Sequence, residues 1–170
     1  LLAASQHSDR DARRELSSSL QRISSEDGGF AIQLMDVLLE DSDSDVRTLA
    51  TTYLSSLVRT DMPLFVEKAS IVLGRGDQRM TQRIVDSAMR EYLSMDSDDE
   101  SGLLPMAWMS SNEGSKSRLA GLMIQQAGVS QLGFREASLK IREASEEDFQ
   151  DLRSRILRRD PSMSDIMDSS

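Results

Sequence analysis

Three alternating aspartates are the residues of this sequence best spaced for metal chemistry. Asp41, Asp43 and Asp45 match the first three ligand positions of an EF-hand loop, in which carboxylate oxygens hold a calcium ion. The loop also needs a glycine at its sixth position and a glutamate at its twelfth, but these positions hold Val46 and Thr52. The pattern therefore favours a turn whose carboxylates cap the next helix, and we predict neither a metal site nor a cofactor.

Side chains suited to catalysis are scarce in this chain. It has no cysteine and a single histidine, His7, which excludes a cysteine nucleophile and leaves little for a Ser-His-Asp triad or a histidine-rich metal site. Gly74 and Gly76 lack the preceding strand and the third glycine of a dinucleotide-binding loop. No acid/base pair stands at a defined spacing, so we predict a protein that is not an enzyme and has no catalytic residues.

The composition bounds the fold class and the partners. Of 170 residues, 38% are hydrophobic and 4% are aromatic, which allows a core but argues against a β-sandwich or barrel. The net charge of −9 disfavours nonspecific binding to nucleic acid but leaves local basic patches open. The sequence contains no run of about 18 apolar residues and no basic start before an apolar signal segment. We expect a cytoplasmic protein that does not act at membranes.

A sequence pattern recurs at a spacing of about 34 residues. Residues 9–13 and 43–47 share the pattern Asp-x-Asp-(Ala/Val)-Arg. The same register continues as a column of apolar residues: Leu20, Leu54, Met89, Ile124 and Leu157. Such self-similarity indicates a repeat architecture, in which each unit buries its apolar face against its neighbours.

The apolar periodicity within each repeat is helical. Val46, Leu49, Ala50 and Tyr53 follow the i, i+3, i+4, i+7 spacing of one helix face. No segment alternates with a period of two, so we predict no sheet. The acidic run 96–100 is expected to be a solvated loop. The helices are expected near residues 9–24, 28–40, 44–59, 63–74, 78–94, 102–110, 115–127, 132–144 and 147–159.

The stretch from Leu38 to Leu54 resembles a HEAT repeat. It has that family's apolar pair, acidic turn, Val-Arg dipeptide at Val46-Arg47, small residue at Ala50 and leucine four positions later. The other units match more weakly but keep the register, and their period is shorter than the roughly 40–47 residues of HEAT and armadillo units. The resemblance implies an all-α fold, an α-solenoid of about four to five stacked helical hairpins.

The expected domain organisation follows from this register. We expect residues 1–160 to form a single HEAT-like repeat domain that is a fragment of a longer solenoid. Residues 161–170 are either a polar tail or the start of a further repeat. The same register aligns Trp108 with apolar positions in three other units, so we expect its side chain in the core.

The basic residues of this acidic chain concentrate on the second helix of each hairpin. Of 20 basic residues, 17 are arginines, and 15 of the 20 lie on or at the edge of these helices. The resemblance implies that the second helices line a concave surface, which would then carry a basic ridge. The residues expected at the centre of this ridge are Arg47, Arg79, Arg83, Arg90 and Arg118.

The arginines have two alternative interpretations. A planar guanidinium binds carboxylates and phosphates, so the ridge could hold an acidic peptide, another domain's carboxylates or phosphate groups. Alternatively, Arg13 and Arg47 match the repeat's own structural arginine, which is expected to pair with the acidic turn. Other arginines would then balance nearby carboxylates through i, i+4 pairs.

The leading functional prediction is a non-catalytic scaffold or adaptor that docks a protein partner on its concave face. The alternative is a nucleic-acid-binding module, since the resemblance extends to HEAT-like DNA glycosylases. The net charge, the scarcity of lysine and the few aromatics for stacking bases argue against nucleic acid. HEAT-like bilin lyases and hydrolases, and segments that serve assembly or oligomerisation, complete the range that the resemblance allows. The oligomeric state stays open.

Overall fold

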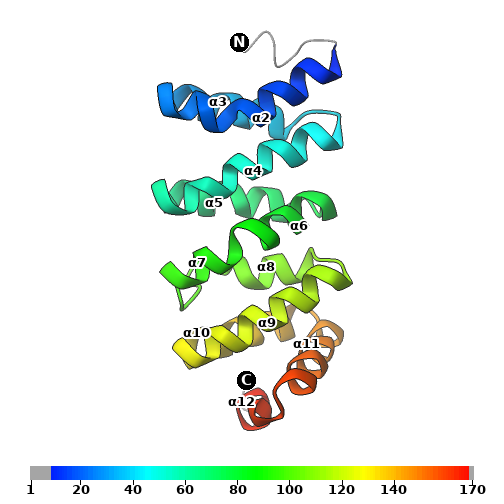
Figure 1. The fold of residues 1–170 in the computed structure, drawn as a ribbon. Helices are drawn as coiled ribbons and strands as arrows, with labels where there is room; N and C mark the ends of the chain where they lie inside the picture. Colours follow the sequence, from blue (N-terminus) through cyan, green and yellow to red (C-terminus); the bar gives the residue numbers. More distant parts are fainter. Residues whose placement is uncertain (1–8, 169–170) are drawn as a thin grey trace. The chain divides into compact units, whose positions relative to one another are not determined.

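The computed structural model of the chain describes residues 9–168, and these residues fold almost entirely into helices (Figure 1). This part contains eleven α-helices, one short 3-10 helix and no strand, which confirms the predicted all-α class. The chain divides into two compact units, residues 1–68 and 69–170, and the boundary falls within α5 (Met62–Gly74). Between residues 9 and 168, no helix combines the length and the apolar character that crossing a membrane would need.

Unit 1 is built from α2 (Arg10–Glu26), α3 (Gly28–Leu39), α4 (Ser44–Thr60) and the first part of α5. Helices α2, α3 and α4 all pack against one another. Their apolar stripes meet in a core in which Leu20, Leu34, Leu38 and Leu54 are fully buried. Burying one leucine contributes roughly 1.5–3 kcal/mol, so these contacts hold together helices that would be marginal alone.

The acidic turn of unit 1 has the predicted capping role. Asp43 accepts hydrogen bonds from the backbone N–H groups of Asp45 (2.9 Å) and Val46 (3.2 Å) at the start of α4. Asp41 accepts from the N–H of Asp43 at 2.8 Å. These bonds satisfy backbone donors that a helix N-terminus otherwise leaves unpaired. The carboxylates are therefore occupied in building the turn.

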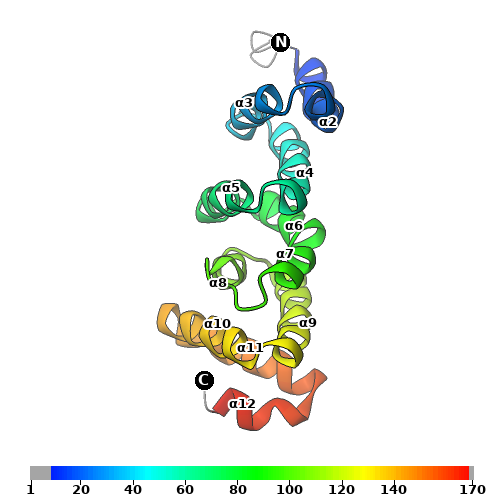
Figure 2. The same ribbon diagram turned by 90° about the vertical axis from the view of Figure 1, so that its left-hand side faces the viewer.

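Unit 2 holds the rest of α5 and the remaining helices. These are α6 (Gln78–Ser87), α7 (Met89–Met95), α8 (Leu103–Met109), α9 (Glu113–Val129), α10 (Gln131–Ala144), α11 (Glu146–Arg159), the 3-10 helix η1 (Pro161–Met163) and α12 (Ser164–Asp168). Within this unit, α6, α7 and α9 form one layer, and α8 and α10 form another (Figure 2). Trp108 of α8 is fully buried, as its repeat position predicted.

The predicted single helix over 78–94 is wrong at one point. The chain bends at Ala88, whose φ of −121° and ψ of −38° depart from regular helix, so that α6 and α7 are separate. No proline or glycine lies there. The Ser87 hydroxyl donates to the Arg83 carbonyl at 2.5 Å. The same type of bond from Thr48, Thr51 and Ser55 leaves α4 continuous, so this bond alone does not explain the bend.

The end of the described chain is also helical. The sequence left open a polar tail or a further repeat after residue 160. Residues 161–168 form η1 and α12, and Met163 and Met167 are buried. Helix η1 packs against α11, and α12 contacts α10, so this segment extends the core of unit 2.

Candidate functional site

Four of the five predicted ridge residues lie in unit 2. Arg79 and Arg83 belong to α6, Arg90 belongs to α7 and Arg118 belongs to α9, and all four side chains reach the surface. Arg79 and Arg83 share one face of α6 at the spacing i, i+4, and Arg90 extends this stripe on α7, beyond the bend at Ala88. Because α6 packs against α9, Arg118 joins this stripe from the neighbouring helix. We call these four residues the arginine surface.

The charges on this surface are only partly neutralised. Arg118 forms an ion pair with Asp86 of α6 through its Nη1 atom, which ties α9 to α6. Arg83 and Arg90 form no ion pair within residues 9–168. Exposed guanidinium groups on adjacent turns repel one another and attract anions. The arrangement can bind carboxylates or phosphates in a bidentate manner.

The fifth predicted residue, Arg47, lies in unit 1 and has a different environment. It is half-buried, and its Nη1 atom donates to the backbone carbonyls of Asp41 (2.7 Å) and Ser42 (3.1 Å). Arg13 of α2 reaches the same turn, with its Nε atom 2.7 Å from the Asp41 carboxylate. This hydrogen bond raises the pKa of Arg13 above its ordinary value. Both arginines thus hold the acidic turn, as the structural interpretation predicted.

A second group of basic residues joins α9 to α11. Arg155 of α11 donates from Nε to Asp151 and from Nη1 to Ser117, both at 2.7 Å, and it also pairs with Glu113. The Lys116 ammonium lies 2.5 Å from the Asp148 carboxylate. A cavity of about 420 Å³ opens beside Arg155. These contacts hold α9 and α11 together. Both acidic and basic groups line the cavity, so it favours neither anionic nor cationic ligands.

A buried polar cluster that the sequence did not reveal lies in the acidic run 96–100. We expected this run to be solvated, but Asp99 is only 2% exposed. Its Oδ1 atom accepts from the Tyr92 hydroxyl at 2.8 Å, and its carboxylate also accepts from the Leu104 N–H at the start of α8. The Tyr92 hydroxyl is 2.5 Å from the Ser101 hydroxyl. Five consecutive polar residues give no sign of which one turns inward.

Asp99 is also the one described residue other than glycine with a positive φ, 50°. Burial raises the pKa of Asp99 to about 6, against hydrogen bonds from Tyr92 and Leu104 that favour the charged form. Burial also raises the pKa of Tyr92 above its ordinary range. The folded protein therefore loses stability when the Asp99 carboxyl group ionises.

Asp99→Asn is therefore expected to stabilise the protein at neutral pH. The folded form binds the Asp99 proton more tightly than the unfolded form does, so wild-type stability from this group is complete below about pH 4 and falls as the pH rises through about 6. Asparagine keeps the acceptor oxygen, tolerates a positive φ and does not titrate. The difference in free energy of unfolding between Asp99→Asn and the wild type is expected to be about 1–3 kcal/mol larger, in favour of the variant, at pH 7 than at pH 4. Urea unfolding at both pH values measures it.

The matched control for this measurement is Glu100→Gln, which removes an exposed carboxylate next to Asp99. Both variants remove one carboxylate, so the comparison separates the buried cluster from the change in net charge. An equal pH dependence in both variants would show that Asp99 is not the titrating group.

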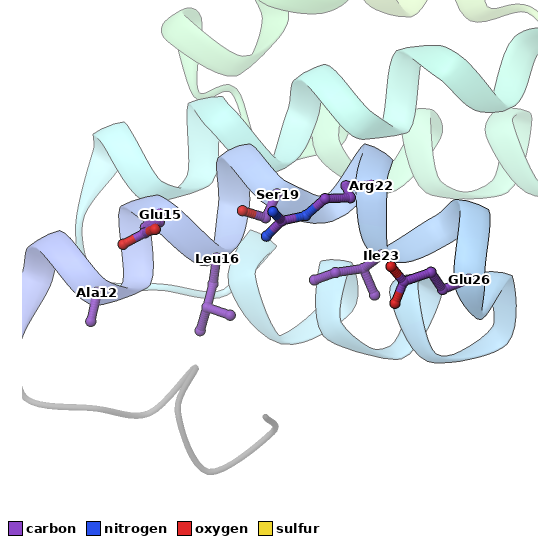
Figure 3. Close-up of a pocket in the computed structure, with 7 residues that line it drawn as sticks. All are labelled: Ala12, Glu15, Leu16, Ser19, Arg22, Ile23 and Glu26. Atoms are coloured by element: carbon purple, nitrogen blue, oxygen red, sulfur yellow. The ribbon is translucent and has the colours of Figure 1, made fainter.

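An open groove of about 430 Å³ runs along one face of α2 (Figure 3). Ala12, Leu16 and Ile23 supply its apolar part, flanked by charged side chains such as Glu15 and Arg22. The residues 34 positions later, on the matching face of α4, are the buried side chains Val46, Ala50 and Leu57. This face is therefore partly exposed on α2, whereas the matching face of α4 is buried.

This difference predicts losses of different size for two leucines on α2. Leu20 is fully buried and Leu16 is half-buried on the groove. We expect Leu20→Ala to lower the free energy of unfolding by about 2–5 kcal/mol. Leu16→Ala should cost less, about 1–2 kcal/mol, because part of its side chain already meets solvent on the groove. Chemical denaturation of both variants measures this, and equal losses would mean that the groove is covered in solution.

No group of three or more acidic or histidine side chains that could hold a metal ion occurs in the described part of the chain. Comparison of the sequence with protein-family models and with curated proteins, and of the structure with solved structures, gives no match.

Proposed function

We propose that this chain is a non-catalytic protein-interaction module that binds an acidic protein partner through its arginine surface. The observation that carries the proposal is the stripe of Arg79, Arg83 and Arg90 on α6 and α7, continued by Arg118 on α9. All four side chains reach the surface, where Arg118 also pairs with Asp86. Arg13, Arg47 and Arg155 are half-buried and hold turns and helix contacts. An acidic protein that keeps a cluster of exposed arginines has a surface suited to carboxylates.

The fold of the module is proposed to be a HEAT-like α-solenoid. Support comes from the register of about 34 residues and from the acidic caps that begin the second helices, among them Asp43 and Asp77. Helices also pack against their neighbours in the chain, as α2, α3 and α4 do in unit 1 and α9, α10 and α11 do in unit 2. A solenoid offers extended surface without a deep pocket, which suits an adaptor. We propose that it acts in the cytoplasm.

The test is capture of partners from source-cell lysate, with and without nuclease. The proteins compared are the wild type, Arg79→Glu/Arg83→Glu, and the control Arg135→Glu/Arg142→Glu, which makes the same charge change on α10. We expect a protein partner that survives nuclease, is lost with the first variant and is retained by the control. Recovery that disappears with nuclease would favour nucleic acid as the ligand. If all three proteins recover the partner equally, the arginine surface does not bind it.

A further inference from the structure

The arginine surface ends in a small apolar groove between α7 and α9. Its volume is about 170 Å³, and its lining includes Arg90. The apolar side chains are Leu93 of α7 and Leu122 and Val129 of α9. Leu93 and Leu122 are nearly buried, but Val129 is 79% exposed. On α9, Leu122 and Val129 lie on the same helix face as Arg118, at spacings of i+4 and i+11.

The size of the groove limits what it can hold. Sites for cofactors and small molecules usually enclose about 300–1,000 Å³, so this one is too small for them. No aromatic residue lines it, and stacking of a nucleobase would need one. One aliphatic side chain matches both the volume and the apolar wall.

An unsatisfied acceptor lies in the same lining. Gln126 is 4% exposed, and its Nε2 atom donates to the Ser97 carbonyl at 2.8 Å, which fixes the orientation of the amide. Its Oε1 atom is buried and accepts no hydrogen bond from the described residues. A buried acceptor without a donor is unfavourable. Because this oxygen is shielded from solvent, Gln126 forms part of the groove's wall and is not a contact for a ligand's N–H.

Charge complementarity identifies the rest of the ligand. The exposed Arg90 lines the groove and forms no ion pair within residues 9–168. The neighbouring residues of the arginine surface add further positive charge along α6 and α9. A carboxylate close in sequence to the aliphatic side chain would pair with Arg90 while that side chain enters the groove.

We infer that the groove between α7 and α9 takes one aliphatic side chain of an acidic protein segment, with a neighbouring carboxylate on Arg90. This inference rests on the proposed function and adds the partner's chemistry to it. The partner's motif is one or more acidic residues next to a leucine, isoleucine, valine or methionine. The apolar contact supplies selectivity that guanidinium groups alone lack.

The probe is a short synthetic peptide with two glutamates next to a single leucine, and two matched peptides carry Leu→Ser or Glu→Gln. Binding is followed by NMR through the methyl groups of Leu93, Leu122 and Val129 and the side-chain amide of Gln126. We expect saturable shifts at all four residues with the first peptide. The serine peptide should lose the methyl shifts, and the glutamine peptide should bind several-fold more weakly. No shift at these residues at millimolar peptide would overturn the inference.

Two exposed aliphatic residues provide matched variants of the protein. Val129→Glu places a negative charge in the groove, whereas Leu139→Glu makes a comparable change on α10 outside it. We expect the first variant to raise the Kd for the peptide and for the captured partner at least tenfold and the second to leave both unchanged. If the partner needs Arg79 and Arg83 but binds Val129→Glu like the wild type, the groove inference fails and the proposed function stands. If neither set of changes affects the partner, both fail.

Discussion

Gly133→Ala is expected to lower the free energy of unfolding by about 2–3 kcal/mol, a large effect for one added methyl group. A Cβ atom at Gly133 would lie 2.5 Å from the Ser97 carbonyl oxygen and 2.6 Å from the Asp98 Cα atom. Both are backbone atoms, which cannot swing aside as a flexible side chain does. The loop that contains Ser97 and Asp98 would therefore have to move.

Movement of this loop would break several bonds at once. Gln126 donates to the Ser97 carbonyl, and the Ser130 hydroxyl donates to the Asp98 carboxylate at 2.5 Å. The loop leads directly into Asp99, which supports α8 through the Leu104 N–H. The added methyl thus loosens the junction of α7, α8 and α10.

The matched control is Gly128→Ala, the same change near the end of α9. A Cβ atom there has no neighbour within 4 Å, and alanine restricts the unfolded chain more than glycine does. We expect a gain of about 0.5–1 kcal/mol from this variant. Urea unfolding measures both. Losses of equal size at the two positions would contradict the close approach of the loop to Gly133.

Arg79→Glu/Arg83→Glu is expected to weaken binding of the acidic partner at least a hundredfold while the protein stays folded. Each arginine lost removes charge-assisted hydrogen bonds, worth roughly 1.5–3 kcal/mol apiece, and each glutamate repels the partner's carboxylates. A factor of ten corresponds to about 1.4 kcal/mol, so two such losses exceed a hundredfold.

The fold should tolerate this double change. Arg79 lies in the first turn of α6, where a negative charge is favoured by the helix dipole. Both side chains are exposed, and their reversal replaces one like-charged i, i+4 pair by another. Circular dichroism should show unchanged helical content. If the double variant loses both binding and helical content, unfolding explains the lost binding. The milder variant Arg83→Gln then tests the surface, and we expect it to stay folded and to bind the partner more weakly.

Much of the fold could be predicted because the signals are local. Apolar spacing marked each helix stripe, and aspartates, serines and an asparagine marked the caps, so that Asp43, Asp77 and Asn112 cap helices. Trp108 could be placed in the core because its repeat position is apolar in other units. These features depend on a residue and its neighbours within one or two turns, or on the repeat register.

The features that the sequence did not reveal depend on contacts between distant segments. Asp99 turns inward where the loop crosses Gly133, and nothing distinguishes it from Asp96 or Asp98 in the sequence. No proline or glycine marks the bend at Ala88, so helical periodicity continues through it.

The candidate site was predictable only in part. The sequence pattern selected Arg47 and Arg83 alike, since both lie on second helices. Arg47 donates to the carbonyls of its own turn, whereas Arg83 is exposed. The groove beside Arg90 is lined by residues of both α7 and α9. It could not be predicted, because helical periodicity does not indicate which residues of two helices lie side by side.

The most direct test of the central claim is arginine footprinting of the protein in complex with its captured partner. Phenylglyoxal modifies exposed guanidinium groups, and mass spectrometry of the digested protein locates each modified residue. With the partner at saturation, we expect Arg79, Arg83 and Arg90 to be protected, and Arg135 on α10 to react as in the free protein. Unchanged modification of the arginine surface in the saturated complex would contradict the account, because the partner would then bind elsewhere on the molecule.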